Sequence, residues 1–416
     1  MTGTITFAKL LFLLFFFQDV INVALAKLGL VDAIGLFSSL KEVIVVLLLV
    51  QHWLRAAPGR QLHFTSVSLM LFLALLFTLG VWRGLERFPL DGVVFELRTL
   101  ALPILIFFWG HAFIEVGTDR ERALEEMVRF YTGVCVVFAA SALIDYLFLG
   151  DNFWTWVDVG TISRAKGYVA TSSGALPDNM YSFFFGRRAF GLAFNPLNLA
   201  YMLIPALLFA FYRHQITRFA VMLTAFILSF SRLPILATMA SVMIAVLPRG
   251  LRLIAFVFGG IGVGWLVYAG REALFADPSA RGHFADVAFA LVQQLINPLG
   301  EGVGAAGVYA GNYSVLSVES AVLNTANQIT ILGLAAYLLI LAPGLSRSGP
   351  LHRELRLVAA IYGITAVFAP QVFVIKSTFA FFFFLGANAA LSYRSTAFFG
   401  RSAGVGPRQP VGLGSE

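Results

Sequence analysis

Residues 218–247 read RFAVMLTAFILSFSRLPILATMASVMIAVL, an apolar run whose only charged residue after the first position is Arg232. The run is long enough to cross a membrane more than once. Both of its flanks are basic, with Arg213 and Arg218 at the start and Arg249 at the end. Because basic flanks of membrane helices favour the cytoplasm, both ends should lie on the same side. The sequence therefore predicts a helical hairpin with Arg232 near its outer tip.

The composition of the whole chain also indicates a membrane protein. Its 416 residues are 59% hydrophobic and only 12% charged, and the mean hydropathy is +0.84. This excludes an ordinary soluble domain. Apolar segments of spanning length recur along the chain. The expected spans are 5–23, 39–54, 64–81, 97–115, 127–149, 191–212, 218–231, 233–247, 253–269, 321–343, 357–369 and 371–392.

These segments predict an all-α polytopic membrane protein with about 12 transmembrane helices. Two long loops, 150–190 and 270–320, are expected on the outer side, and both termini in the cytoplasm. Residues 1–400 then form a single transmembrane domain. The tail 401–416 is rich in Gly and Pro and is predicted to be disordered. The single cysteine, Cys135, excludes a disulfide within the chain.

The outer side is unexpectedly basic in this topology. Arginine on the translocated side opposes insertion, so its clustering there suggests that the loops bind an anion. A planar guanidinium group suits phosphate oxygens because it binds them through two parallel hydrogen bonds. The basic residues predicted on the outer side are Arg164, Lys166, Arg187, Arg188, Arg232, Arg271 and Arg281.

The second outer loop contains two recognisable segments. Apolar side chains fall at helical spacing in 281–296, which predicts an amphipathic helix on the membrane surface. An ordinary connecting loop is the alternative. Residues 297–304 then carry three glycines and predict a tight turn.

In the first loop, Asn195 and Asn198 are expected to place two amides on one helical face near the membrane, where polar groups usually have a function.

The order of these motifs resembles the superfamily of bacterial O-antigen polymerases and O-antigen ligases. Residues 188–198 read Arg-x-x-Gly-x-x-x-Asn-Pro-x-Asn at the end of the first loop, and Ser231-Arg232 lies at the hairpin tip. The second loop has an arginine-led helix followed by Asn-Pro-x-Gly-x-Gly-x-Gly in 281–304. The polar dyad Glu319-Ser320 precedes the next helix. The resemblance covers roughly 187–334.

The resemblance implies a GT-C-like integral membrane glycosyltransferase of the bacterial inner membrane, with periplasmic outer loops. Such proteins transfer a glycan from undecaprenyl pyrophosphate to an acceptor hydroxyl, without a metal or other cofactor. Ligases usually have His-Asn where this chain has Glu319-Ser320, which favours a polymerase of O-antigen, capsule or exopolysaccharide repeat units. An O-antigen ligase acting on lipid A-core is the alternative. A polytopic transporter or a lipid-linked oligosaccharide flippase is the alternative of another class.

Expected partners are the undecaprenyl-pyrophosphate-linked glycan, membrane lipids and, as a candidate, a chain-length regulator; nucleic acid is not expected. The resemblance also implies roles for individual residues. Glu319 is the candidate base for the acceptor hydroxyl, and His283 is the next candidate. The alternative for Glu319 is an ion pair or a favourable place at a helix N-terminus. Pyrophosphate binding is expected from Arg188, Arg232 and Arg281, and other substrate contacts from Arg187, Asn195, Asn198 and Ser320.

Overall fold

The structure is a computed structural model that describes residues 2–30, 32–55, 64–116, 119–157, 181–182, 186–248, 251, 278–306, 320–367, 369 and 375–401. Nearly all of these residues are helical, which confirms the predicted class in this part of the chain. The one sheet described is an antiparallel ribbon of two short strands, β1 (Tyr181–Ser182) and β2 (Gly186–Arg187).

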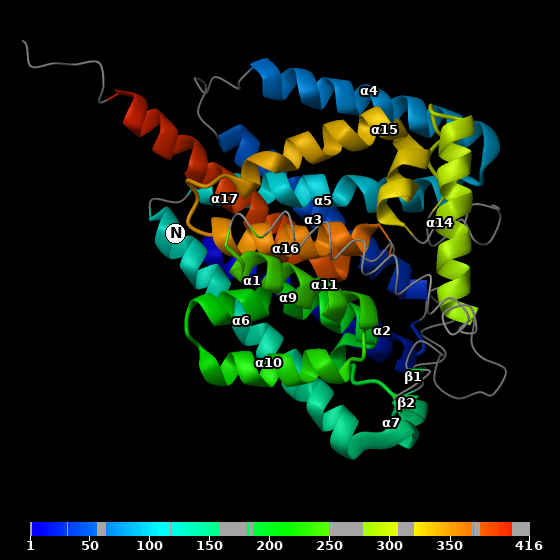
Figure 1. Cartoon of the computed structure of the whole chain (residues 1–416), viewed down its shortest axis with the longest axis vertical. Helices are drawn as coiled ribbons and strands as arrows, with labels where there is room; N and C mark the ends of the chain where they lie inside the picture. The colour runs from blue at the N-terminus through cyan, green and yellow to red at the C-terminus, as the bar shows by residue number, and fades with distance from the viewer. Residues whose placement is uncertain are drawn as a thin grey trace, which may run out of the picture.

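Most helices run roughly side by side, whereas α14 lies across them at one end (Figure 1). The first part of the chain forms α1 (Thr2–Phe16), α2 (Gln18–Lys27), α3 (Asp32–Arg55), α4 (Phe64–Arg87), α5 (Leu90–Val116), α6 (Arg120–Ile144), the π-helical turn η1 (Asp145–Leu149) and α7 (Gly150–Val157). The second part forms the 3-10 turn η3 (Gly191–Ala193), α9 (Pro196–Tyr212), α10 (Ile216–Leu228), α11 (Arg232–Val246), α14 (Pro278–Ile296), α15 (Ala321–Leu341), the 3-10 turn η5 (Ala342–Leu345), α16 (His352–Ala366) and α17 (Ile375–Arg401).

The centre of the molecule is formed by α5 and α17, which approach each other at glycines. A Cβ atom built on Gly110 would lie 2.0 Å from the carbonyl oxygen of Phe383, and one on Gly386 would lie 1.8 Å from that of Phe107. Close backbone contact of this kind is common between membrane helices, where small residues allow tight packing. The ring of Phe12 on α1 then packs edge-on against Phe383, with 5.0 Å between the ring centroids.

Within the described residues, four helical segments are long and apolar enough to cross a membrane. They are Ser68–Arg87, Leu90–Glu115, Arg120–Val157 and Ala321–Leu345. This supports a membrane protein by length and composition. Helices α1 and α2 pass the same test only as a pair, with a bend of 61° between them at Phe17. The segment predicted as the span 5–23 is therefore apolar enough but broken by a bend, and whether it crosses the membrane stays a prediction.

The predicted number of about 12 spans is not confirmed. Several apolar helices are shorter than a full crossing: Pro196–Tyr212, Ile216–Leu228, Arg232–Val246, Ala285–Ile296 and Ser377–Ser392. The predicted span 253–269 lies outside the described residues. Helix α7 occupies the start of the segment predicted as the first long outer loop, 150–190. Helix α6 continues into α7 through η1, a π-helical turn that begins at Asp145.

The run 218–247 does fold back on itself. Helix α10 ends at Leu228 and α11 begins at Arg232, with Phe230 in a left-handed conformation at φ 44° between them. Both helices pack on α9. Tyr212 at the end of α9 and Ala245 near the end of α11 line the same cavity, so the run returns to the side from which it started. The predicted hairpin is confirmed as a fold; which side faces the cytoplasm stays a prediction.

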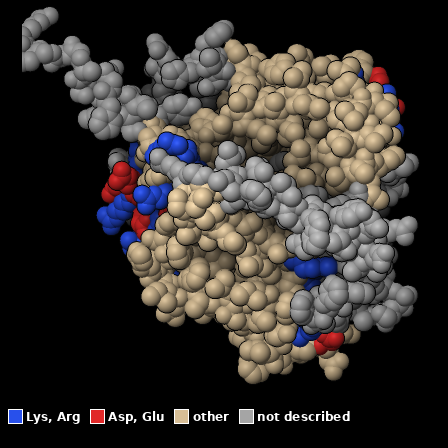
Figure 2. Space-filling view, in the orientation of Figure 1, with Lys and Arg blue, Asp and Glu red and all other residues tan. Residues whose placement is uncertain are grey.

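Charged side chains gather at the two ends of the helices. On the face drawn in Figure 2, Lys, Arg, Asp and Glu lie toward opposite ends, and the surface between them carries little charge. At one end, Arg213 contacts Glu125 at 2.9 Å and Glu354 at 3.3 Å. At the other end, Arg87 contacts Glu301 at 2.5 Å. This distribution fits helices that present their apolar middle to lipid and their ends to water.

Candidate functional site

Arg188 joins three segments at the end of the bundle where the α10–α11 link lies. Its Nε donates a hydrogen bond to the carbonyl oxygen of Ser229 at 2.8 Å, and its Nη2 donates to Ser231 Oγ at 2.9 Å. Ser231 Oγ in turn donates to the carbonyl oxygen of Pro196 at 3.2 Å. The loop after β2, the helix link and the start of α9 are therefore held together around one guanidinium group.

Arg232, the first residue of α11, places a second positive charge beside Arg188. Burial of Arg188, together with the charge of Arg232, lowers the pKa of Arg188 from its ordinary value to about 10. Two neighbouring guanidinium groups favour an anion that contacts both of them. The structure thus brings together Arg188 and Arg232, two of the three arginines predicted to bind pyrophosphate.

Arg187, although adjacent in sequence, has a different environment. Its guanidinium group forms an ion pair with the fully buried Asp145 and lies 3.2 Å from Asp151. Asp145 also accepts hydrogen bonds from the indole of Trp154 and from the backbone N–H of Gly191 at 3.1 Å. These contacts fix the loop that carries Arg188. They give Arg187 a positioning role, while its predicted contact with substrate stays untested.

The sequence contains a signal for this ion pair. Asp145 lies inside the predicted apolar span 127–149, where a carboxylate is costly unless it has a partner. The partner is 42 positions away in the sequence. Sequence spacing alone does not identify such a distant partner. The π-helical turn that begins at Asp145 contains no proline or glycine, and Gly150 with φ 63° follows it directly.

The two asparagines at the start of α9 have unequal roles. Asn195 precedes the helix, and its Oδ1 accepts from the backbone N–H of Leu197 at 2.8 Å. It is therefore the N-cap of α9 and precedes the helix instead of sharing a helical face with Asn198, and its predicted contact with substrate stays a prediction. The Asn198 side chain is half-buried and has no hydrogen-bond partner among the described residues. It remains the amide that can contact a substrate beside Pro196.

The predicted residues of the second outer loop are only partly described. Ser320 is buried and caps α15, because its Oγ accepts from the N–H of Leu323 at 3.3 Å. Glu319, the candidate base, lies outside the described residues. Arg281 and His283 belong to α14, but the structure does not describe their side chains. Ser320 therefore has a structural role as a helix cap, and its predicted substrate contact stays a prediction, as do the other three assignments.

Helix α14 confirms that residues 281–296 are helical, while their position on a membrane surface stays a prediction. It packs against α15 on one side. Its last turns expose large apolar side chains, with Leu295 74% and Ile296 72% accessible. In Figure 1 it lies at the same end of the molecule as β2, the strand that precedes Arg188. An apolar face exposed across the end of a helical bundle is typical of a helix lying in a membrane interface.

The glycine-rich turn after α14 inserts between α4 and α15. A Cβ atom on Gly300 would lie 2.5 Å from the carbonyl oxygen of Asn327, and one on Gly302 would lie 2.7 Å from the N atom of Gly84. Gly300, Gly302 and Gly304 all have positive φ. Only glycine satisfies both the close approach and the backbone angle. The predicted tight turn is confirmed.

A buried polar cluster beneath this turn was missed by the sequence analysis. Gln328 of α15 accepts from the N–H of Gly304 at 3.1 Å and donates to Asn324 and, at 3.5 Å, to Glu96 of α5. Just after Gln328, α15 leaves helical geometry, and Thr330 has φ 76°. Asn324 and Gln328 lie four positions apart in an apolar segment, and this spacing indicates a buried polar cluster, because polar groups at membrane depth need partners.

The described residues include no group of three His, Cys, Asp or Glu side chains that could hold a metal ion. Comparisons with protein-family models, with curated proteins and with solved structures find no match to this chain. A function for the chain therefore has to be argued from its own residues, chiefly from the paired arginines at the end of the helical bundle.

Proposed function

We propose that this chain is a membrane glycosyltransferase that polymerises glycan units carried on undecaprenyl pyrophosphate, at the periplasmic face of the bacterial inner membrane. The observation that carries the proposal is the pair Arg188 and Arg232, whose charges lie close enough for one to lower the pKa of the other. A pyrophosphate group has the charge and the oxygen geometry to satisfy two guanidinium groups together. Its lipid tail would remain in the apolar layer beside the bundle.

In the proposed reaction, the bond between the anomeric carbon and the pyrophosphate oxygen breaks as the acceptor oxygen attacks that carbon. The bonding electrons leave with the pyrophosphate, so negative charge grows at the leaving oxygen. Arg188 is already oriented by Ser229 and Ser231, so little reorganisation is needed when that charge develops. Arg232 is exposed and supplies the second positive charge.

The acceptor hydroxyl loses a proton in the same step, and a base must accept it. The resemblance in sequence assigns this role to Glu319, with His283 as the next candidate. Asn198, with no side-chain partner among the described residues, is proposed to contact the sugar. Helix α14, with its exposed apolar turns, supports a substrate that approaches from within the membrane.

The proposal is tested by Arg232→Ala in cells or proteoliposomes supplied with the lipid-linked repeat unit. A charge-assisted contact used in the transition state contributes about 2–4 kcal/mol, so polymer formation should fall roughly a hundredfold or more. Arg232→Lys should restore little, because a point charge does not replace the planar fork. Arg218→Ala is the matched control, since Arg218 is exposed and contacts Gln215 at the far end of α10.

The Arg232→Ala variant and the unchanged chain must be present in the membrane in equal amounts, so that the loss of polymer reports activity and not expression. Full activity of Arg232→Ala would remove the proposal. The same assay separates the ligase alternative: growth of the lipid-linked chain identifies a polymerase, whereas transfer only to added lipid A-core identifies a ligase.

A flippase or transporter is the second candidate, and a specific observation favours it. Broken helices that carry polar groups at membrane depth are typical of transporter binding sites. Here α15 is interrupted at Ile329 and Thr330, beside the buried Gln328 and Glu96, and Lys41 is buried on α3. Proteoliposomes loaded with the lipid-linked unit distinguish the two: movement of the lipid between leaflets without chain growth would establish the transporter.

A further inference from the structure

A basic cavity lies at the end of the bundle opposite Arg188. It has a volume of about 610 Å³ and lies where α9, α11 and α16 meet. Pro196, which contacts the Arg188 cluster, begins α9, whereas Tyr212 at the other end of this helix lines the cavity. Sixteen residues of α-helix separate them by roughly 24 Å. The cavity is therefore separate from the proposed catalytic site.

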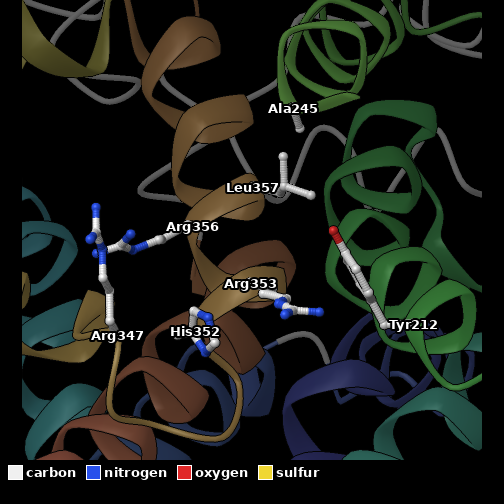
Figure 3. A pocket seen from close by; sticks show the side chains of 7 residues that line it. All are labelled: Tyr212, Ala245, Arg347, His352, Arg353, Arg356 and Leu357. Atoms are coloured by element: carbon white, nitrogen blue, oxygen red, sulfur yellow. The ribbon is translucent and has the colours of Figure 1, made fainter. Parts of the chain in front are cut away.

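Positive charge converges on the cavity from two segments. Arg347 comes from the connection between η5 and α16, and Arg353 and Arg356 come from α16. Figure 3 shows the guanidinium groups of Arg347 and Arg356 beside each other, with Arg353 extending from the helix toward Tyr212. Arg347 and Arg353 are exposed and have no hydrogen-bond or ion-pair partner in the described part of the chain. Adjacent guanidinium groups of this kind favour an anion between them.

The position of these arginines on α16 increases the need for an anion. The N-terminus of a helix carries a partial positive charge, so cations there are unfavourable and anions are favourable. The first five residues of α16 nevertheless include Arg353 and Arg356, together with His352. The acidic residue in this turn, Glu354, is buried and already lies 3.3 Å from Arg213. It does not compensate the arginines that face the cavity.

The remaining wall of the cavity is apolar and continues onto the exposed surface of α11. Leu357 and Ala245 line it, and α11 packs against α16. From Ala245 the surface of α11 continues with Met243, 66% accessible, and Val246, 79% accessible. A ligand that fits this surface has a negatively charged head and apolar chains. A soluble anion would use only the basic half.

We propose that this cavity binds the phosphate headgroup of an anionic phospholipid, with the acyl chains lying along α11. Arg347, Arg353 and Arg356 contact the phosphate oxygens, and Tyr212 offers a hydroxyl group to the same headgroup. Basic pockets between membrane helices bind anionic lipid headgroups on this physical basis. The site does not depend on the glycosyltransferase proposal, because no residue is shared between the two.

The test uses the full-length chain purified in a neutral detergent. Phosphatidylglycerol, phosphatidylcholine and inorganic phosphate are added separately, and binding is measured by native mass spectrometry and by the shift in melting temperature. Phosphatidylglycerol should bind and stabilise the protein, and the other two should not. At about 1 kcal/mol for each basic residue, each arginine removed should weaken binding roughly fivefold, and Arg347→Gln with Arg353→Gln roughly 25-fold.

Arg218→Gln is the matched control, because Arg218 is exposed at the same end but does not line the cavity. Arg353→Lys keeps the charge and should retain most of the affinity. Equal binding of phosphatidylcholine would overturn the requirement for an anionic head. Inorganic phosphate binding as tightly as the lipid would show a soluble-anion site instead. Unchanged lipid binding in the double variant, which removes only exposed side chains, would place the lipid elsewhere.

Discussion

Replacing Asp145 by Asn should destabilise the protein strongly, because it removes the charge but keeps the shape. The Asp145 side chain has no exposed surface, and that of Arg187 is 15% exposed. Removing one partner of a buried ion pair costs about 3–5 kcal/mol, since the other charge stays buried without compensation. Asp151, 47% exposed and 3.2 Å from Arg187, offsets part of this cost. We therefore expect a loss of about 3 kcal/mol.

At about 2–4 °C for each kcal/mol, the melting temperature should fall by roughly 6–12 °C. Cys135 provides the assay: it is the single cysteine and is buried, so a thiol-reactive dye reports its exposure on heating. Arg129→Gln is the control, because Arg129 pairs with Glu125 one helical turn away and its side chain is 69% exposed. Such surface pairs contribute about 0.3–0.5 kcal/mol.

The double variant Asp145→Leu with Arg187→Met sharpens the test. Replacing both charges by apolar groups of similar size leaves no unpaired charge, so this variant should be more stable than Asp145→Asn. If Asp145→Asn melts within about 1 °C of the unchanged protein, or no more differently than Arg129→Gln, the buried ion pair described above is refuted.

Two further outcomes are expected. Gly110→Ala should destabilise the protein by about 1–3 kcal/mol, because its Cβ would lie 2.0 Å from the carbonyl oxygen of Phe383. The control is Gly133→Ala, whose Cβ would have nothing within 4 Å. The melting temperature of this control should stay the same or rise. The lowered pKa of Arg188, about 10, means that its charge disfavours the ligand-free fold at neutral pH. This penalty begins to shrink as pH rises through 10 and vanishes only above the ordinary pKa of arginine. Inorganic pyrophosphate should therefore raise the melting temperature at pH 7, less so near pH 10, and less in Arg188→Gln than in the unchanged chain; an equal gain in that variant would contradict the anion site.

The elements that local sequence determines were predicted well. The break in 218–247 follows from basic flanks at both ends, and α10 and α11 indeed end and begin within three residues of the predicted tip. Helix α14 follows from its apolar periodicity. The glycine turn follows from three glycines at alternate positions. Glycine is the residue that adopts positive φ without steric cost, and all three glycines have positive φ.

The features that were missed depend on contacts between distant segments. The 61° bend after Phe16 has no proline or glycine at that point, and it arises where α2 packs on α3 and η3. The interruption of α15 likewise occurs without proline. At this point the backbone N–H of Glu301 in the glycine turn donates a hydrogen bond to the carbonyl oxygen of Asn327 at 2.7 Å. Apolar composition identifies a segment as membrane-embedded, but it does not show where tertiary hydrogen bonds replace helical ones.

The shortness of the hairpin helices has a consequence for the surrounding lipid. Helix α10 has 13 residues and α11 has 15, so they are roughly 20 and 22 Å long. The hydrocarbon layer of a typical bilayer is about 30 Å thick. In the membrane position proposed above, the layer around this hairpin thins to avoid hydrophobic mismatch, at a modest cost for each ångström. Headgroups would then descend beside the link between the helices, and the pyrophosphate of the proposed lipid-linked donor would reach Arg232 while its isoprenoid tail stays in the lipid.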